Sequence, residues 1–496
     1  MKALVPLPFL IPLLGAALSI LAGRTRALQR IVGIASLAAV VVISIILLVE
    51  ADSNGAVISQ AGGWSAPMGI TLVADRFSAL LLVVASVMLL AVLVYAIGEP
   101  GAERNHVGFQ SVYLVLAAGV SLAFLTGDLF NLFVAFEMML TASYVLLTLG
   151  GREDQIRSGM TYVVISLLAS TLFVTALALL YSATGTVNMA DLAGRIGDLP
   201  PGVRSAFAVL LVVVFGIKAA LFPLFFWLPD SYPTAPGPIS AVFAGLLTKV
   251  GIYAIIRTQT LFFPPESRPD TLLLVLAGAT MLIGVLGAIA QDDFKRILSF
   301  DIVSQVGYMV MGLAFFTVAG VAGAVYCMVQ HIVVKTTLFL TGGLIEHRAG
   351  SSQLSRVGDM IRTAPVLAVL FLVPALSLAG VPPLSGFVAK FALVDAGIDA
   401  REYTVVGVSL LVSLLTLFLM VRIWNGVFWS PAEEPPIEPQ KKERLGGPVL
   451  MVVPTALLVL GGVALGIFAG PVYDLSERIA RDLLEPSAYL TGVLGE

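Results

Sequence analysis

Long apolar runs alternate with short polar segments from one end of the chain to the other. The runs are about 20 residues long, the length that an α-helix needs to cross the hydrocarbon core of a bilayer. Counting them predicts an all-α polytopic membrane protein with about fourteen transmembrane helices. The predicted spans cover residues 3–22, 31–49, 77–97, 109–126, 129–149, 159–182, 205–229, 238–257, 271–290, 297–316, 321–345, 365–396, 403–429 and 447–470.

Two of the predicted spans are interrupted by proline. Pro223 lies in the seventh span, and Pro382 and Pro383 lie in the twelfth. Proline removes a backbone donor and clashes with the preceding turn. In a membrane such a break persists only where it lies against protein or water. If spans four to eight and nine to thirteen form two five-helix units, each unit has its broken helix in fourth place. Five is odd, so the second unit is inverted, which is typical of secondary transporters.

The same pattern divides the chain into four parts. We expect three N-terminal helices in residues 1–108, the first repeat in 109–257, the second, inverted repeat in 271–429, and a C-terminal helix and tail in 430–496. The segment before Asp75 predicts a short hairpin, and the segment between Tyr181 and Arg204 predicts an interfacial helix. Arginine and lysine are more frequent in the loops after odd-numbered spans, which places both termini outside.

Composition supports the membrane interpretation and narrows the chemistry. The chain has 496 residues, of which 58% are hydrophobic and 12% charged, whereas soluble domains carry about 25% charged residues. One cysteine, Cys327, excludes an internal disulfide and a Cys-ligated metal cluster. Only three histidines are present: His106, His331 and His347. We therefore expect no cofactor, no metal site, no nucleic-acid partner and no enzymatic reaction, but a protein that moves something across the bilayer.

Ionisable residues inside the apolar helices are the strongest functional signal. They are Glu137, Lys218, Lys249, Lys335 and Lys390. A lysine at the bilayer centre costs at least ~2.5–3.5 kcal/mol, so intramembrane charges usually mark an ion or proton path. Glu137 and Lys218 are natural partners, because the distance between an acid and a base changes the proton affinity of both. The alternative is that these groups only anchor helix packing.

Two further pairs carry candidate roles. His331 and Lys335 are four residues apart and share a helix face, which favours a relay, although a buried histidine can also be a satisfied core residue. Asp301 and Gln305, also four apart, lie near the cytoplasmic end of the tenth span. We consider them possible proton-uptake groups, although an acid near a helix start is also expected from the helix dipole.

Several segments resemble a known family. They are FNLFVAFEMM around Glu137, KAALFPLFFWLPDSYPTAPGPISAVFAGLLTKVGIY from Lys218, DFKRILSFDIVSQVGYM from Asp293, HIVVKTTLFLTGGLIE around Lys335, and GVPPLSGFVAKF ending at Lys390. These segments resemble the proton-conducting membrane family shared by Mrp cation/proton antiporters and respiratory complex I, and within it the D-type antiporter subunits.

The resemblance implies a role for each matching residue. Glu137 and Lys218 would be the coupling pair and Lys249 the central lysine. His331 and Lys335 would form the second-half relay, and Lys390 would be the exit lysine. Asp301 departs from the pattern, because a histidine is frequent there in D-type subunits, so the uptake route stays open.

The resemblance also implies a function. The chain would be a multi-pass subunit of a multisubunit Na⁺/H⁺ antiporter in a bacterial plasma (inner) membrane. It would conduct H⁺ through the midplane residues, coupled to Na⁺ efflux, with other antiporter subunits as partners. One alternative is a proton-translocating membrane subunit of complex I. Another is a non-conducting assembly scaffold of such a complex.

Overall fold

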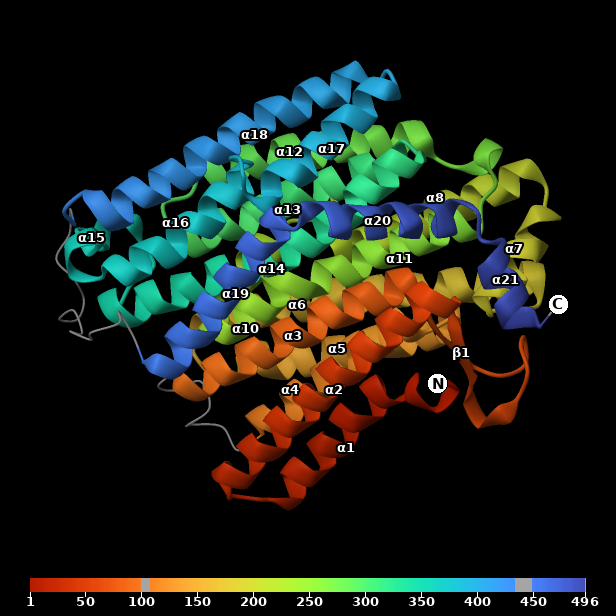
Figure 1. Cartoon of the computed structure of the whole chain (residues 1–496), viewed down its shortest axis with the longest axis horizontal. Helices are drawn as coiled ribbons and strands as arrows, with labels where there is room; N and C mark the ends of the chain where they lie inside the picture. The colour runs from red at the N-terminus through yellow and green to blue at the C-terminus, as the bar shows by residue number, and fades with distance from the viewer. Residues whose placement is uncertain (100–107, 433–447, 496) are drawn as a thin grey trace.

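Helices running roughly along one direction make up most of the molecule (Figure 1). The computed structural model describes residues 1–99, 108–432 and 448–495. The unbroken spans are α1 (Leu7–Leu21), α2 (Arg26–Asn54), α3 (Arg76–Gly98), α4 (Phe109–Leu125), α5 (Leu129–Thr148), α6 (Glu153–Thr184), α12 (Asp270–Ile289), α13 (Phe294–Ala314), α14 (Val318–Ala349) and α19 (Val449–Ile467).

The remaining spans are assembled from shorter pieces. The eighth span joins α10 (Gly237–Val242), a π-turn (Phe243–Leu247) and α11 (Thr248–Leu261), and the thirteenth joins α18 (Tyr403–Trp424) to a π-turn (Asn425–Trp429). Among the described residues, twelve helices are long and apolar enough to cross a membrane, and α4 and α16 (Pro365–Ala379) are shorter apolar helices. Each of the fourteen predicted spans coincides with a helix or a broken helix, so the predicted fold class is confirmed.

Both predicted breaks are present. α8 (Pro201–Ala219) ends at Ala220 in the left-handed conformation, and α9 (Trp227–Ser231) follows after a loop that contains Pro223. α16 ends at Gly380, also left-handed, and α17 (Ser385–Asp399) follows after Pro382 and Pro383. The left-handed residue turns the chain out of the helix, and the prolines then block a direct continuation.

Matching details identify the two units as repeats. Asp128 caps α5 and forms a backbone bridge with Asn188, and Asp293 caps α13 and forms a bridge with Gln353. The third helices, α6 and α14, each have 32 residues and end at a left-handed glycine. α7 (Met189–Gly197), which Asn188 caps, lies at the right-hand end in Figure 1, whereas α15 (Met360–Thr363), shortly after Gln353, lies at the left. The second repeat is therefore inverted.

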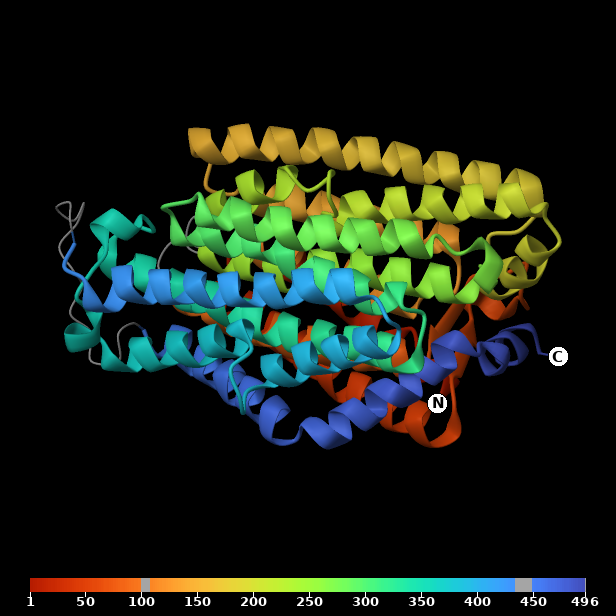
Figure 2. The same cartoon turned by 90° about the horizontal axis from the view of Figure 1, so that it is seen from above.

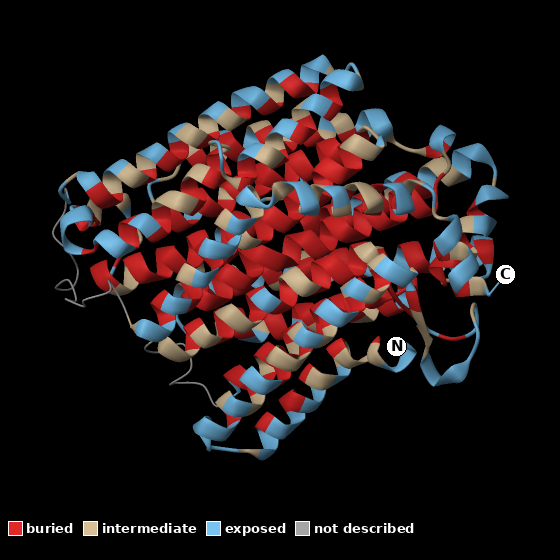
Figure 3. Ribbon diagram, in the orientation of Figure 1, coloured by how far each residue is buried: buried red, intermediate tan, exposed pale blue. Residues whose placement is uncertain are grey.

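The core is centred on α14. This helix packs against α3, α10, α13, α16, α17, α19 and α20 (Ala469–Leu484). Buried residues gather in the middle of the bundle, and exposed residues lie on the outer helices (Figure 3). α6, coloured yellow-orange, forms one edge of the molecule when it is seen from above (Figure 2). Polar residues on α14 are therefore kept away from lipid by protein on several sides.

Smaller elements close the end of the bundle that the distribution of arginine and lysine predicts to face outward; this end is called the outer end, and the opposite one the inner end. The predicted hairpin is confirmed as β1 (Val57–Gln60) paired antiparallel with β2 (Thr71–Ala74), and the predicted interfacial helix is α7. The remaining short pieces are 3₁₀ turns at Lys2–Leu4, Ala61–Gly63, Tyr232–Thr234, Pro265–Ser267 and Leu354–Arg356. The tail after α19 forms two further helices, α20 and α21 (Ser487–Leu494), of which α20 crosses the face of the bundle (Figure 1).

α20 ties the two ends of the chain together. It buries one face, made by Ser476, Ile479, Ala480 and Leu483, a spacing that places them on one side of a helix. From the opposite side Arg478 pairs with Asp52 of α2 at 3.0 Å. Arg76 of α3 pairs with both Asp52 and Asp482, each at 2.8 Å. The C-terminal tail thus completes the outer end of helices formed at the beginning of the chain.

Candidate functional site

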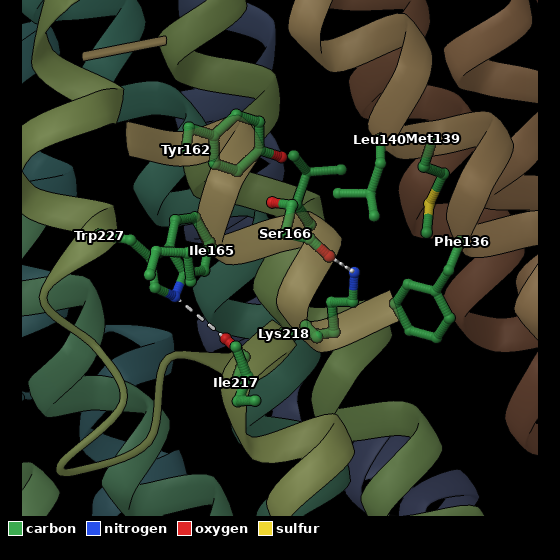
Figure 4. Close-up of a pocket in the computed structure, with 11 residues that line it drawn as sticks. Phe136, Met139, Leu140, Tyr162, Ile165, Ser166, Ile217, Lys218 and Trp227 are labelled. Atoms are coloured by element: carbon green, nitrogen blue, oxygen red, sulfur yellow. Dashed lines mark hydrogen bonds between the residues drawn. The ribbon is translucent and has the colours of Figure 1, made fainter. Parts of the chain in front are cut away.

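Lys218 occupies the last turn of α8, immediately before the first break. Its side chain is almost wholly buried, and its ammonium group donates to the Ser170 hydroxyl at 3.2 Å. It also donates to the Ser166 carbonyl at 3.3 Å (Figure 4). The Ser170 hydroxyl in turn donates to the carboxylate of Glu137. The predicted pair of Glu137 and Lys218 is therefore brought together, but through a serine that the sequence analysis did not identify.

Ser170 belongs to a polar stripe on α6. Ser158, Tyr162, Ser166 and Ser170 follow one another at intervals of four residues, which places them on one face. Tyr162 bonds the Ser143 hydroxyl at 2.9 Å. One pocket along this stripe is lined by Tyr162, Ser166, Lys218 and Trp227, and a second, nearer the inner end of α6, is lined by Ser158, Thr161, Asp230 and Arg296. The stripe therefore leads from the inner surface toward Lys218.

Lys249 lies deep in the bundle on α11, directly after the π-turn. Its side chain is wholly buried, and its ammonium group donates to the Ala244 carbonyl at 2.6 Å. Among the described residues no carboxylate forms an ion pair with it. The neighbouring Thr248 hydroxyl is buried and has no hydrogen-bond partner in the described part of the chain. The hydrogen bond that the structure gives the ammonium group of Lys249 is therefore to a peptide carbonyl and not to a carboxylate.

Lys335 has a direct counter-ion. Its ammonium group contacts the carboxylate of Asp301 on α13, and neither side chain is exposed. Lys335 also donates to the Leu298 carbonyl at 3.2 Å, and Gln305 donates to Asp301 at 3.4 Å. Asp301 and Gln305, predicted near the cytoplasmic end of the tenth span, are both buried, and Asp301 contacts a lysine of the next span. Spacing along one helix cannot indicate a partner on another helix, and this pair was therefore missed.

His331 and Lys390 complete the set of predicted residues. His331 is wholly buried one turn before Lys335, within electrostatic reach of Lys249, Lys335 and Lys390. Lys390, on α17, donates to the Ser413 hydroxyl at 3.0 Å and to the Ala379 carbonyl at 3.3 Å, and its ammonium group lies 5.2 Å from the centre of the Tyr308 ring. Ala379 ends α16, so Lys390 joins the two halves of the second broken helix.

Buried polar atoms without protein partners connect these groups. In the described part of the chain they include the hydroxyls of Thr248 and Thr336, the amide nitrogen of Gln330 and both ring nitrogens of His331. A Cβ on Gly245 would lie 2.3 Å from the Thr336 hydroxyl, and a Cβ on Gly386 would lie 3.2 Å from the Gln330 amide nitrogen. These polar atoms therefore extend from the helix of Lys249, along α14, to the helix of Lys390.

Metal binding has no visible basis in the described residues. No three histidine, cysteine, aspartate or glutamate side chains are grouped there as they would be around an ion. His106 lies outside the described residues. The ionisable groups are instead lysines and carboxylates, which are suited to proton transfer.

The fold and the site place the chain in a class of multi-pass membrane proteins. Proteins of this class have two inverted units, each with a broken helix and with buried, mutually coupled charges near the break. A family model described as NADH:quinone oxidoreductase/Mrp antiporter, TM, matches residues 126–416. The chain belongs to this family.

The relatives and a solved structure agree with this assignment. The chain is 46% identical to the D-type subunit of the Na(+)/H(+) antiporter from Alkalihalophilus pseudofirmus and 39% identical to its counterpart from Bacillus subtilis, with 100% of each chain covered in both alignments. A chain in the structure of the Mrp complex from Dietzia sp. matches with a TM-score of 0.91 and 33% identity, covering 100% of this chain and 99% of that one. With the spans described above, these findings confirm the prediction of a multi-pass bacterial membrane protein.

Proposed function

We propose that this chain is a D-type subunit of a multisubunit Na⁺/H⁺ antiporter in a bacterial plasma membrane, working as a transporter subunit rather than an enzyme. Relatives that align over their whole length carry the name of such a subunit, which supports the proposal. The Mrp complex that contains the matching solved chain supports hetero-oligomeric partners. H⁺ and Na⁺ are the transported ions.

Protons enter the first repeat along the polar face of α6. The inner pocket by Ser158 and the pocket by Lys218 favour this route. When Lys218 is charged, Ser170 links it to the carboxylate of Glu137, and the pair stabilises both charges. When Lys218 releases its proton, the bridge loses its charge assistance. Lys218 therefore binds and releases the proton, and the hydrogen bonds through Ser170 to Glu137 change with the charge of Lys218.

Transfer through the interior passes from Lys249 by way of His331 to Lys335 with Asp301, and then to Lys390. The unpaired hydroxyl, amide and imidazole groups between these lysines support this path, because buried polar atoms of this kind are ordinarily satisfied by ordered water. Water bridges carry protons between groups too far apart for direct contact. The uptake role considered for Asp301 is replaced by that of an internal counter-ion, with Gln305 holding its carboxylate.

We also propose a division of the chain into two repeats and two flanking parts. We assign the first repeat to residues 109–257 and the second to 271–429, with 1–108 before them and 430–496 after them. Residues 100–107 and 433–447, near two of these boundaries, lie outside the described residues. The paired bridges and paired breaks of the two units support the division.

The observation that carries the proposal is Lys249, a wholly buried lysine with no carboxylate partner in the described chain. A buried lysine of this kind has no evident use in a protein that serves only as a non-conducting assembly scaffold. The test is Lys249→Met in the assembled complex, with Na⁺-dependent pH change measured in inverted membrane vesicles. We expect transport to be lost while assembly persists. The matched control is Arg362→Met, which removes an exposed cation. Normal transport by the assembled Lys249→Met complex would favour the scaffold.

The complex I alternative is tested by the partners. Copurification with small multispan antiporter subunits supports the proposal. Copurification with hydrophilic iron–sulfur subunits would instead assign the chain to a redox-driven proton pump, since the matching family model covers both classes.

A further inference from the structure

At the inner ends of helices that carry the proposed relay, one ion pair joins a lysine to a glutamate, and the carboxylate of a second glutamate lies within electrostatic reach of both. Glu99 directly follows α3, Lys295 lies in the first turn of α13, and Glu346 lies near the end of α14. α13 holds Asp301 and α14 holds Lys335. None of the three inner residues belongs to the proposed relay.

Lys295 and Glu346 form an ion pair, in which the lysine side chain is 7% exposed. This contact joins the inner ends of α13 and α14, the same two helices that Asp301 and Lys335 join in the interior. The inner pair and the interior pair therefore hold the same two helices together at two levels.

Glu99 is not part of this ion pair. One of its carboxylate oxygens, Oε2, is buried and has no hydrogen-bond partner in the described part of the chain. The nearest hydroxyl on its own helix, that of Tyr95, donates instead to the Leu340 carbonyl at 2.9 Å. Its backbone N–H is held by the carbonyls of Tyr95 and Ala96, so the position of the residue is fixed by the helix end.

A glycine makes the space that the carboxylate occupies. A Cβ on Gly237, the first residue of α10, would lie 3.1 Å from one Glu99 oxygen and 3.6 Å from the other. The carboxylate therefore lies against the start of the span that carries Lys249. The site is built by three relay-bearing spans and closed by α3.

The charges around Glu99 indicate which ligand it binds. Within the described residues, Lys295 supplies a positive and Glu346 a negative charge that act on Glu99, α10 approaches it at Gly237, and Tyr95 is a titratable group on α3 itself. With both carboxylates ionised the cluster carries one excess negative charge. Burial raises the pKa of Glu99 to about 7, Lys295 lowers it and Glu346 raises it. In the described residues no third acid or histidine completes a metal site.

We infer that Glu99 is a proton-binding site at the inner face, and that its proton decides whether Lys295 pairs with Glu346 alone or is shared with Glu99. The inference rests on the proposed function, because Glu99 would affect transport through the relay residues. Protonated Glu99 leaves the inner ion pair tight. Ionised Glu99 competes for Lys295, loosens the contact between α13 and α14, and allows Lys335 to separate from Asp301. Alkalinity on the inner side therefore promotes transport.

The binding step is tested without transport. Infrared difference spectra of the purified complex, taken a unit above and a unit below the midpoint, should contain a protonated-carboxyl band that titrates near pH 7. The band should be absent in Glu99→Gln and retained in Glu485→Gln, which changes an exposed tail residue. In Lys295→Gln its midpoint should rise by about one unit, because a neighbouring cation favours the ionised acid. A band that persists in Glu99→Gln overturns the assignment.

The coupling is tested in inverted vesicles by varying the pH on the face that corresponds to the inner side. Wild-type Na⁺-dependent H⁺ movement should rise through the Glu99 midpoint, and Glu99→Gln should remain at the low-pH rate. If Glu137→Gln abolishes antiport while Glu99→Gln keeps the wild-type pH profile, the relay stands and the inference about Glu99 is wrong. If neither substitution affects antiport, the proposed function itself fails, whatever the infrared titration shows.

Discussion

The ammonium group of Lys335 lies directly on the carboxylate of Asp301, and both are excluded from the surface. The acid and base of the first repeat, Glu137 and Lys218, are joined instead through the Ser170 hydroxyl. A bridged pair changes its coupling when one hydroxyl rotates, whereas a direct pair must separate two charges. The first repeat is therefore the more easily switched of the two.

Ser170→Ala should uncouple the first pair. The substitution removes the hydroxyl that links Lys218 to Glu137 and leaves one bond of Lys218, to the Ser166 carbonyl. Loss of a buried bond to a charged group costs about 1.5–3 kcal/mol, so Na⁺-dependent H⁺ movement in vesicles should fall by about tenfold or more.

Two further variants serve as controls for Ser170→Ala. Ser170→Thr keeps the hydroxyl and should retain most of the activity. Ser182→Ala removes a hydroxyl from an exposed position on the same helix, where it bonds only the Leu179 carbonyl, and should behave like the wild type. Equal losses in Ser170→Ala and Ser182→Ala would contradict the bridge.

Asp301→Asn should destabilise the protein as well as stop transport. Removing one partner of a buried ion pair typically costs about 3–5 kcal/mol, because the other charge stays buried without compensation. We expect a lower thermal midpoint of the solubilised complex. The double variant Asp301→Leu with Lys335→Met removes both charges and should recover stability without recovering transport. A double variant as unstable as the single one would show that packing, not charge, explains the loss.

The close approach of the π-turn to α14 can be probed at Gly245. A Cβ there would lie 2.3 Å from the Thr336 hydroxyl and 3.3 Å from Met88. Overpacking of this kind costs about 1–3 kcal/mol, so Gly245→Ala should lower thermal stability, and Thr336→Ala should partly restore it. Gly461→Ala, on α19 with nothing within 4 Å, is the matched control and should be neutral or slightly stabilising.

The arginines at the outer end should differ in importance. Arg257 is 6% exposed on its side chain and bonds Asp75 at 2.6 Å beneath the rings of Phe77, Tyr253 and Tyr489. Arg478 is 40% exposed on its side chain where it pairs with Asp52. Arg257→Gln should therefore cost about 3–5 kcal/mol, and Arg478→Gln only about 0–1 kcal/mol. Thermal unfolding that ranks them in the opposite order would refute this argument from burial.

The sequence predicted the helices well because a bilayer leaves the backbone few alternatives. Apolar runs and proline breaks located all fourteen spans, and the cost of burying a lysine identified Lys218, Lys249, Lys335 and Lys390. Partners on other helices were not predictable in this way. Ser170 is one of many serines, and its role depends on how α6 is rotated against α5 and α8. The pairing of Asp301 with Lys335 depends on the depth at which α13 and α14 cross, which spacing along one helix does not reveal.

The tail was missed for a related reason. α20 carries several charges and lacks the long apolar run of a span, so hydropathy alone assigns it to a tail. Its buried face can be recognised only from the structure, in which α20 packs against α14.

The closure of the outer end by the tail has a consequence for biosynthesis. Asp52 and Arg478 are 426 residues apart, so the carboxylate reaches the far side of the membrane long before the ribosome has made its partner. The first two helices must therefore be inserted while their far ends are still unfinished. A chain released early by a stop codon would keep that end open and offer quality-control proteases a recognisable mark of incomplete synthesis.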